Sequence, residues 1–373
     1  MNFKISKRPF YTALTSVSHA ISANSPIPSL SGIKIEALED HLVLTASDSN
    51  ISIQREVYAS EDCELIIFEP GAVVIDSRYI LEIVRKIDSD QLQLELVDGA
   101  LTRISGHLAE FNINGISASL YPDIDFSKQA IEFSVQAKDL VKVIAQTVFA
   151  ASDKETRPVL TGVNFRLVGN EFTAVATDSY RLAKSVVSLD NNDTNFSVTL
   201  PAKSLNEVVK TLEDEDEVIM SVSDKKVQFF LNNTLIQTRL IDGLYPETDR
   251  LIPNEYAYEF EIDAQDLLNA IDRASFIKSD GISVVRLEAS SDEVVISSKS
   301  QEVGSSFEKI VPQSYKGGDL SISFSGKYVY EAIRALNSSK VLIKFSGPMK
   351  PFVILNPGDD SVLQLVLPVR TYN

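Results

Sequence analysis

The chain has 373 residues, of which 44% are apolar, and a formal net charge of −17 at pH 7. This length predicts two or three domains rather than one compact core. No run of 18 apolar residues and no apolar leader follows the initial MNFKISKRPF, which argues against a transmembrane helix or a signal peptide. The single cysteine, Cys63, excludes an intramolecular disulfide framework and favours a reducing compartment, so we expect a soluble, cytoplasmic protein.

The predicted elements occur in the same order three times along the chain. Phe3-Lys4-Ile5 aligns with Phe133-Ser134-Val135 at an offset of 130, and Glu132–Leu140 aligns with Glu259–Leu267 at an offset of 127. The phrases Tyr121-Pro122-Asp123 and Tyr245-Pro246-Glu247 close the first two copies. The repeat therefore predicts three domains of similar fold, with bounds 1–125, 126–252 and 253–373.

Each copy contains two segments with helical spacing of apolar residues, separated and followed by short β-rich runs bounded by Asn, Asp, Gly or Ser. Two helices and about eight strands per copy predict an α+β fold with helices on one face of antiparallel sheets. The predicted helices span 6–22, 76–87, 137–151, 202–212, 264–278 and 326–336.

Charge is divided unequally between these elements. The predicted helices contain 13 Lys and Arg against 7 Asp and Glu, whereas the rest of the chain contains 22 against 45. Basic residues on amphipathic helices are commonly just a solvated face. Because the excess recurs in every copy, it also predicts a shared basic surface that contacts phosphate without reading sequence.

The stretch TDSYRL, residues 177–182, has the polar composition of a site. Asp178 and Ser179 have counterparts in Asp48 and Ser49 and are explained by an Asx-turn that ends a strand. The following Tyr180, Arg181 and Leu182 occur only in the middle copy, and such an addition to a repeated scaffold tends to mark a site.

Catalysis is a poor explanation for this stretch. The three histidines, His19, His41 and His107, are scattered through the first copy. The sequence has no phosphate-binding loop, no His or Cys cluster with metal spacing and no Gly-x-Ser-x-Gly motif. We expect no enzymatic activity, no cofactor and no metal.

The repeats, the basic helices, ATDSYRLA at 176–183, LIDGLYPETDRLIP and the closing LVLPVR at 365–370 together resemble the β sliding clamp family of bacterial replicative DNA polymerase. The resemblance covers essentially the whole chain. It implies a DNA-clamp fold, a head-to-tail dimeric ring with helices lining the hole, and a processivity factor that encircles duplex DNA. Twelve helices about 9.5 Å apart would leave a hole of roughly 26 Å, which clears a duplex about 20 Å wide.

The resemblance also implies a pocket for short peptides of the replicative polymerase, the clamp loader and other clamp-binding proteins. Its wall is expected to contain Leu160, Thr177, Tyr180, Arg181, Leu182, Pro246, Arg250, Leu251, Tyr328, Met349, Leu365, Val366, Leu367, Pro368, Val369 and Arg370. The chain departs from the familiar pattern in having Ser179-Tyr180 in place of Gly-His, and Leu-Pro-Val-Arg followed by three residues in place of Met-Pro-Met-Arg.

Two further surfaces follow from the same resemblance. Asn24 falls where a DNA-contacting Arg is expected, which gives Lys154 more of that role. The residues expected to face DNA are Lys7, Arg78, Arg85, Lys138, Lys142, Lys154, Lys203, Lys210, Arg273, Lys327 and Arg334. The residues expected at the dimer interface are Arg103, Phe111, Ile113, Phe276 and Ile277. The alternative function is a three-repeat scaffold that binds protein motifs without encircling DNA.

Overall fold

The structure, a computed structural model, describes all residues except 23–24, 129–130, 191–193, 213–216, 278–282 and 371–373. Asn24 therefore lies outside the described residues. The chain forms two compact units, Met1–Lys138 with Lys203–Leu240, and Asp139–Ala202 with Ile241–Asn373. These units divide the middle copy of the repeat between them.

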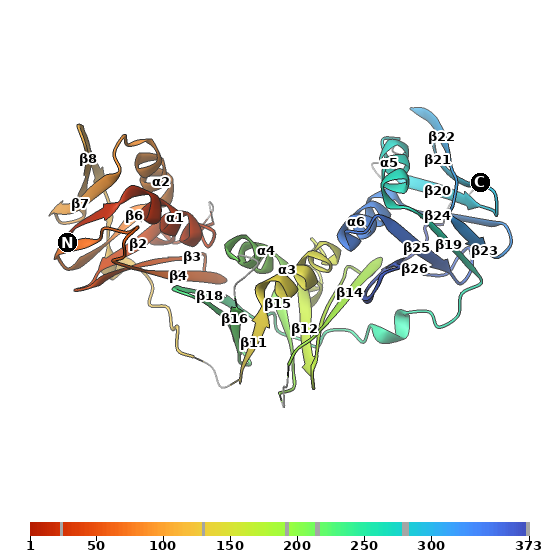
Figure 1. The fold of residues 1–373 in the computed structure, drawn as a ribbon, viewed down its shortest axis with the longest axis horizontal. Coiled ribbons are helices and arrows are strands. Elements are labelled where there is room, and N and C mark those ends of the chain that lie inside the picture. Colours follow the sequence, from red (N-terminus) through yellow and green to blue (C-terminus); the bar gives the residue numbers. More distant parts are fainter. Residues whose placement is uncertain (23–24, 129–130, 191–193, 213–216, 278–282, 371–373) are drawn as a thin grey trace. The chain divides into compact units, whose positions relative to one another are not determined.

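All six predicted helices are present, and most are shorter than predicted (Figure 1). Asp76 begins the second by accepting from the Arg78 N–H, and Asp263 begins the fifth by accepting from the N–H groups of Gln265 and Asp266. Such N-caps fix where a helix starts. The helices are α1 (Lys7–Ser18), α2 (Ser77–Lys86), α3 (Ala137–Ala145), α4 (Ala202–Thr211), α5 (Ala264–Ser275) and α6 (Gly326–Leu336).

The largest difference from prediction is at the end of α3, which was expected to reach residue 151. The Thr147 hydroxyl donates to the Val143 carbonyl at 2.6 Å, and Thr147 itself has a φ of −127°. A threonine that bonds its own backbone competes with regular helix, so the chain changes to the 3-10 turn η3 (Val148–Ala150).

Unit 1 contains a five-stranded and a nine-stranded antiparallel sheet. The smaller has the order β5-β1-β7-β8-β9 and the larger the order β10-β6-β2-β3-β4-β18-β17-β16-β11. The strands are β1 (Asn2–Ser6), β2 (Gly32–Ala37), β3 (His41–Ser47), β4 (Ile51–Tyr58), β5 (Ile66–Glu69), β6 (Gly71–Asp76), β7 (Gln91–Asp98), β8 (Leu101–Gly106), β9 (Ala109–Asn114), β10 (Ile116–Ser117), β11 (Ile131–Gln136), β16 (Glu217–Val222), β17 (Lys226–Leu231) and β18 (Thr234–Arg239).

Unit 2 also contains a nine-stranded sheet, together with a four-stranded one. The larger has the order β15-β12-β13-β14-β27-β26-β25-β19-β23 and the smaller the order β22-β21-β20-β24. The strands are β12 (Gly162–Val168), β13 (Glu171–Thr177), β14 (Arg181–Ser188), β15 (Phe196–Pro201), β19 (Tyr258–Asp263), β20 (Val284–Ala289), β21 (Val294–Ser300), β22 (Gly304–Ile310), β23 (Ser314–Lys316), β24 (Leu320–Ser325), β25 (Lys340–Phe345), β26 (Phe352–Asn356) and β27 (Asp359–Val366).

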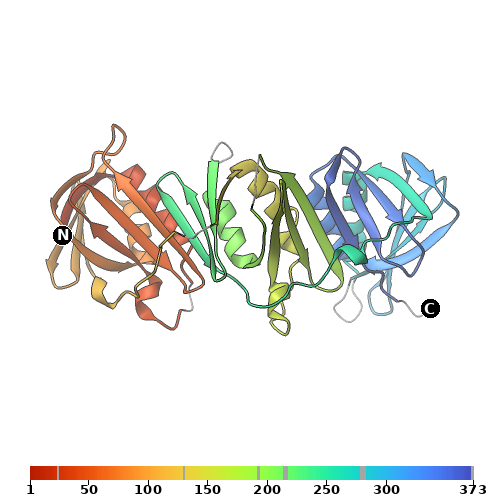
Figure 2. The ribbon, with the colours of Figure 1, turned by 90° about the horizontal axis from the view of Figure 1, so that it is seen from below.

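Successive copies of the repeat are joined by continuous sheet. β4 of the first copy pairs with β18 of the second, and β14 of the second pairs with β27 of the third. Figure 2 shows the strands of each nine-stranded sheet in front of the helices of its unit. The α+β class with helices on antiparallel sheets is confirmed.

The core of the third copy lies between its two sheets and around α5 and α6. Phe260 and Phe345 of the larger sheet stack with their ring centroids 5.8 Å apart, and both are fully buried. Leu267 of α5 and Ile333 of α6 belong to the same buried cluster. Helix-period and strand-period apolar residues therefore meet in one core, as the sequence pattern predicts.

None of the described helices has the length and apolarity needed to cross a membrane. Within the same residues, no group of three or more His, Cys, Asp and Glu side chains is placed to hold a metal ion.

Candidate functional site

The turn that carries Asp178 is the same device in two copies of the repeat. The Asp178 carboxylate accepts from the N–H groups of Tyr180 at 2.8 Å and Arg181 at 3.0 Å. The Asp48 carboxylate accepts from Asn50 at 2.8 Å and Ile51 at 2.9 Å. The residue after each aspartate, Ser49 or Ser179, has a φ of 79°, a conformation that the carboxylate bonds stabilise. The predicted Asx-turn is confirmed.

The residues that follow the turn in the middle copy form part of a joint with the third copy. Arg181 pairs with Val366, and Leu182 with Leu365, in the antiparallel ladder of β14 and β27. Beyond the ladder, the Leu367 N–H donates to the Tyr180 carbonyl at 2.9 Å. The turn and the end of the third copy are thus fixed to each other through the backbone.

An apolar cluster covers one face of this joint, and we call it the joint cluster. Its buried members are Val175, Leu182, Val353 and Leu365. Half-buried side chains pack against them from β26, β27 and the linker between the second and third copies. These are Tyr245, Ile252, Tyr256, Leu355, Leu363 and Leu367.

Tyr245 holds the linker against the turn. Its hydroxyl accepts from the Thr177 N–H at 3.0 Å, and burial raises its pKa, so the phenol stays neutral at physiological pH. The rim of the cluster carries charge: Asp249 of η5 (Asp249–Leu251) pairs with Lys184 at 2.9 Å and lies 3.7 Å from Arg166. Hydrogen bonding to Lys184 lowers the Asp249 pKa below its usual range.

The predicted peptide-pocket residues fall into three groups. Leu182, Leu365 and Leu367 belong to the joint cluster, and Thr177 and Tyr180 are bonded to it through backbone. Several others are exposed or half-buried, and the remaining ones are buried elsewhere. Tyr180, Arg250, Leu251, Met349 and Arg370 are exposed, and Pro246, Tyr328, Pro368 and Val369 are half-buried. Leu160, Arg181 and Val366 are buried, with relative exposures of 2%, 7% and 0%.

Arg181 and Val366 point away from the joint cluster. Side chains alternate along a strand, so the pair Arg181–Val366 points to the face opposite the Leu182–Leu365 pair. Val366 accordingly belongs to the core of the third copy, whereas Leu365 belongs to the joint cluster. Neither Arg181 nor Val366 therefore belongs to the joint cluster.

The sequence predicted three of the ten residues of the joint cluster as pocket residues and missed the other seven, including Val175, Tyr245 and Val353. Part of the signal was available, because Leu363, Leu365 and Leu367 alternate along one strand face. That Tyr245 and Tyr256 pack onto this face depends on the path of the linker, which no local pattern encodes.

The predicted DNA-facing side chains differ in how free they are. Lys138, Lys154, Lys203 and Arg334 are exposed and have no ion-pair partner in the described part of the chain. Others pair at the surface: Arg78 with Asp76, Arg85 with Glu82, Lys210 with Glu207, Arg273 with Glu308 and Lys327 with Glu331. Ion pairs at a protein surface typically contribute only about 0–1 kcal/mol each.

Two of the lysines predicted to face DNA donate hydrogen bonds within the protein. The Lys7 ammonium donates to the Ile87 carbonyl at 2.6 Å. The Lys142 ammonium donates to the Asp359 carboxylate at 2.9 Å and to the Ser361 hydroxyl at 3.1 Å. Lys142 therefore fastens α3 to the β26–β27 hairpin, which makes it a weak candidate for phosphate contact.

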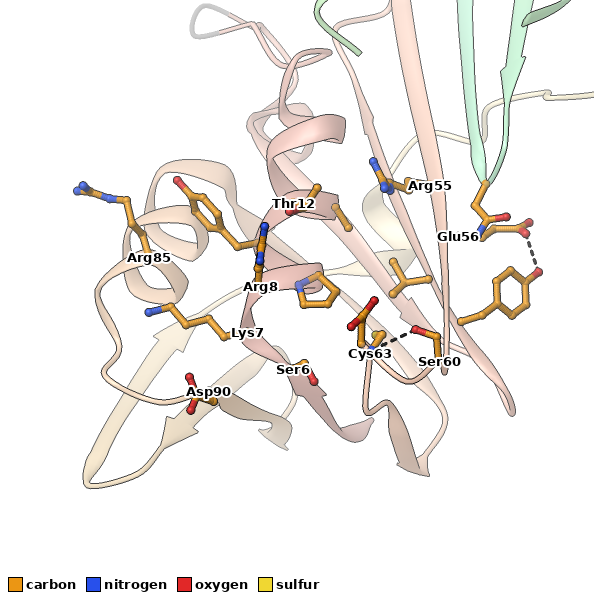
Figure 3. A pocket seen from close by; sticks show the side chains of 17 residues that line it. Ser6, Lys7, Arg8, Thr12, Arg55, Glu56, Ser60, Cys63, Arg85 and Asp90 are labelled. Atoms are coloured by element: carbon orange, nitrogen blue, oxygen red, sulfur yellow. Dashed lines mark hydrogen bonds between the residues drawn. The ribbon is translucent and has the colours of Figure 1, made fainter. Parts of the chain in front are cut away.

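A cavity of about 850 Å³ lies beside α1 in unit 1 (Figure 3). Its lining mixes the cations Lys7, Arg8, Arg55 and Arg85 with the acids Glu56, Asp62 and Asp90. None of the predicted peptide-pocket residues lines it. Because its charges are mixed and Lys7 is bonded to backbone, the cavity does not identify a ligand.

The predicted dimer residues lie at sheet edges or near one. Phe111 and Ile113 are on β9, an edge strand of the five-stranded sheet, and Phe276, just after α5, is 81% exposed. Ile277 is buried within its own copy, where the Ser298 hydroxyl donates to its carbonyl at 3.3 Å. Arg103 pairs with Glu95 and Glu110 on neighbouring strands, which limits its part in an interface.

Comparison with known proteins agrees with this arrangement. The N-terminal, central and C-terminal domain models of the DNA polymerase III beta subunit match residues 1–125, 134–247 and 249–370. The beta sliding clamps of Bacillus subtilis (strain 168) and Staphylococcus aureus are each 39% identical to the chain, with full coverage of both proteins.

Solved structures give the same result. The DNA polymerase sliding clamp from Bacillus subtilis superposes with a TM-score of 0.95 at 38% identity, with full coverage of both chains. The DNA polymerase III beta chain from Streptococcus pneumoniae TIGR4 has a TM-score of 0.95 at 32% identity, covering 99% of this chain and 100% of the other. The chain therefore belongs to the DNA polymerase III beta subunit family, the beta sliding clamps.

Proposed function

We propose that two copies of the chain close into a ring around duplex DNA and tether the replicative polymerase and other proteins to it. The observation that carries this proposal is the repeated sheet joint. The chain contains two such joints, β4–β18 and β14–β27. In each, one strand is the third after the first helix of its copy. Its partner is the third strand after the second helix of the next copy. The counterparts left open are β22 at one end and β9 at the other, both edge strands.

The two joints within the chain use the same register. Ile51 of the first copy pairs with Thr238, and its counterpart Arg181 pairs with Val366. The hairpins define these counterparts. Ser52, Leu182 and Gly304 each pair with the last residue of the preceding strand, so the residues directly before them, Ile51, Arg181 and Val303, correspond. A third joint in this register would place Val303 just before β22 opposite Ile113 of the partner subunit, and Ser305 opposite Phe111 of the partner subunit.

The residues that follow the first helix of each copy support the same arrangement. His19, Phe149 and Phe276 each follow the phenylalanine of their copy's first strand by 16 residues. His19 lies 3.3 Å from Glu207 in the second helix of the next copy, and Phe149 packs against the core cluster that contains α6. Phe276, left exposed, would by analogy meet α2 of the partner subunit, where Tyr79 is 59% exposed. Phe307 on β22 is 65% exposed, and Leu108 in the turn before β9 is 91% exposed.

Each end of the chain thus has an unpaired edge strand with exposed apolar side chains, which a protein does not usually leave in solvent. Joining β22 to β9 of a second copy covers both edges at once, and repeating it in reverse closes a two-fold assembly. We propose this dimer, with domains bounded near residues 125 and 252.

The DNA contact we propose is electrostatic and does not depend on sequence. Basic residues outnumber acidic ones in the helices of a chain whose net charge is −17. Phosphate contact through such side chains is weakened strongly by salt. The chain needs no catalytic group for this role, and we propose no enzymatic activity. Like other replication proteins, it would act in the bacterial cytoplasm.

The joint cluster is the proposed dock for polymerase, clamp loader and other partner peptides. Half-buried aliphatic and aromatic side chains on a rigid sheet can hold one or two apolar anchors of an extended peptide. Each anchor contributes about 1.5–3 kcal/mol, which after ordering costs predicts micromolar affinity for an isolated peptide.

Retention on circular DNA tests the ring. The protein is loaded onto a nicked circle by a clamp loader and passed over a sizing column at 0.5 M salt, with half of each sample linearised beforehand. A ring remains on the circle and leaves the linear form, because escape from the circle requires opening a joint. Equal loss from both forms would reject encirclement, and would favour a motif-binding scaffold that does not enclose DNA.

A further inference from the structure

The Arg181 side chain is committed to contacts inside the protein. Its Nε donates to the Asp178 carboxylate at 3.0 Å, one terminal nitrogen donates to the Phe149 carbonyl at 2.6 Å, and the other forms an ion pair with Glu331. The side chain is only 7% exposed. The guanidinium nitrogens therefore bond to groups that lie away from the face that carries the joint cluster.

Aromatic rings complete the enclosure. The guanidinium lies 4.5 Å from the Tyr328 ring centroid and 5.2 Å from that of Phe149. Cation–π contact at these distances stabilises a desolvated arginine. One side chain therefore connects three distant segments: the turn at Asp178, the 3-10 turn after α3, and α6.

We propose that Arg181 is a positioning residue for the peptide dock and does not itself recognise the peptide. By fastening the Asp178 turn to α6 through Glu331, it fixes Tyr180 and Leu182, which form one side of the dock. The inference rests on the proposed peptide-binding function and assigns the residue a different part in it from the one that the family resemblance implies.

Backbone bonds carry the effect from Arg181 to the dock. The Thr177 hydroxyl donates to the Arg181 carbonyl at 2.6 Å, and the Tyr180 carbonyl accepts from Leu367. A turn that loses its anchor shifts both Leu182 and the Leu367 segment. Glu331 lies on α6, outside the joint cluster. Loss of its carboxylate would therefore change the positions of the dock side chains without removing any of them.

The specific consequence is that Arg181 and Glu331 act as one unit. Peptide affinity is measured by fluorescence anisotropy with a labelled peptide that contains Gln, aliphatic residues and Phe in that order. We expect Arg181→Met and Glu331→Ala each to weaken binding by roughly tenfold or more, and the double variant to bind no worse than the weaker single. Glu331→Gln, which keeps an acceptor oxygen, restores part of the affinity.

The control is an exposed pair in the same unit. Arg286 and Glu288 lie 3.0 Å apart on β20, and Arg286→Met with Glu288→Ala leaves peptide affinity unchanged. If Arg181 touched the peptide, Arg181→Met would weaken binding while Glu331→Ala would not, and that result would overturn the proposal. Unchanged affinity in both variants would overturn it as well.

A second measurement works without peptide. The chain contains no Trp, so Tyr180→Trp gives a single reporter on the turn. Adding Glu331→Ala should shift its emission maximum, and adding the Arg286 and Glu288 changes should not. An unchanged emission maximum rejects the positioning role. Absence of peptide binding by the wild-type chain, with the emission shift present, would instead reject the peptide dock.

Discussion

Lys142 of α3 and Asp359 of β27 form an ion pair with 2.9 Å between nitrogen and oxygen, and this pair fastens the middle copy of the repeat to the third. The Ser361 hydroxyl and N–H both bond the same carboxylate. The pair is half-buried, so its charge is not available to DNA in the way that an exposed lysine is.

DNA binding should therefore respond differently to two lysines. Lys203→Met removes an exposed cation on α4, and we expect the slope of log affinity against log salt for a short duplex to become less negative by about 0.9. Lys142→Met should leave the slope unchanged. Titrations from 50 to 200 mM salt, monitored by anisotropy, make the comparison. Equal slopes for the two variants would contradict it.

The same ion pair predicts a pH dependence of stability. Hydrogen bonds from Lys142, the largest cause, and from Ser361 lower the pKa of Asp359 to about 2. Its folded pKa lies below the unfolded value near 3.9, so the stabilisation is present above pH 4 and is lost as pH falls towards 2. We expect a contribution on the order of 1 kcal/mol after solvent screening. Urea unfolding of wild type and Asp359→Asn at pH 2 to 5 should give curves that converge at the acid end. Parallel curves would show that the pair contributes nothing.

The sequence predicted the repeat and the helices because both depend on local pattern. Amphipathic spacing located all six helices, and the Asx-turn at Asp178 followed from its counterpart at Asp48. The end of α3 was misplaced because Thr147 bonds its own backbone, a choice that apolar spacing does not record.

The site was harder to predict, because the faces of its side chains and the Arg181–Glu331 contact both depend on segments that are distant in sequence. Which face Arg181 and Val366 point to follows from the β14–β27 register, and a shift of one residue would exchange their faces with those of Leu182 and Leu365. The family resemblance gave the neighbourhood of these residues but not their direction. The Arg181–Glu331 contact joins residues 150 positions apart, a distance at which local sequence carries no signal.

A polar substitution in the joint cluster should weaken peptide binding. Leu367 is half-buried in the cluster, and Leu367→Asp places a carboxylate where an apolar anchor would pack. We expect peptide affinity to fall by more than tenfold. Leu244→Asp is the matched control, because Leu244 is 95% exposed and does not belong to the cluster. Calorimetry on both variants decides the point, and equal affinities would move the dock elsewhere.

The register of the proposed joint between subunits can be tested by cross-linking. Directly paired strand residues have the separation that a disulfide needs, whereas a shift of one residue points the two side chains to opposite faces. Ile113→Cys with Val303→Cys should therefore form a covalent dimer on oxidation, and Asn112→Cys with Val303→Cys should not. Cys63, the only native cysteine, is buried and is replaced by Ser in both variants.

An independent variant tests the same joint without chemistry. Phe111 is 38% exposed on the β9 edge, and Phe111→Asp would bury an unpaired carboxylate between subunits. We expect monomers at low micromolar concentration in analytical ultracentrifugation, with circular dichroism unchanged because the side chain lies at an edge. Val168→Asp, at an exposed strand end of the middle copy, should remain dimeric. A Phe111→Asp protein that stays dimeric, together with no cross-link in either cysteine pair, would place the contact between subunits on other strands. Cross-linking of the shifted pair alone would keep β9 and β22 at the contact and change their register.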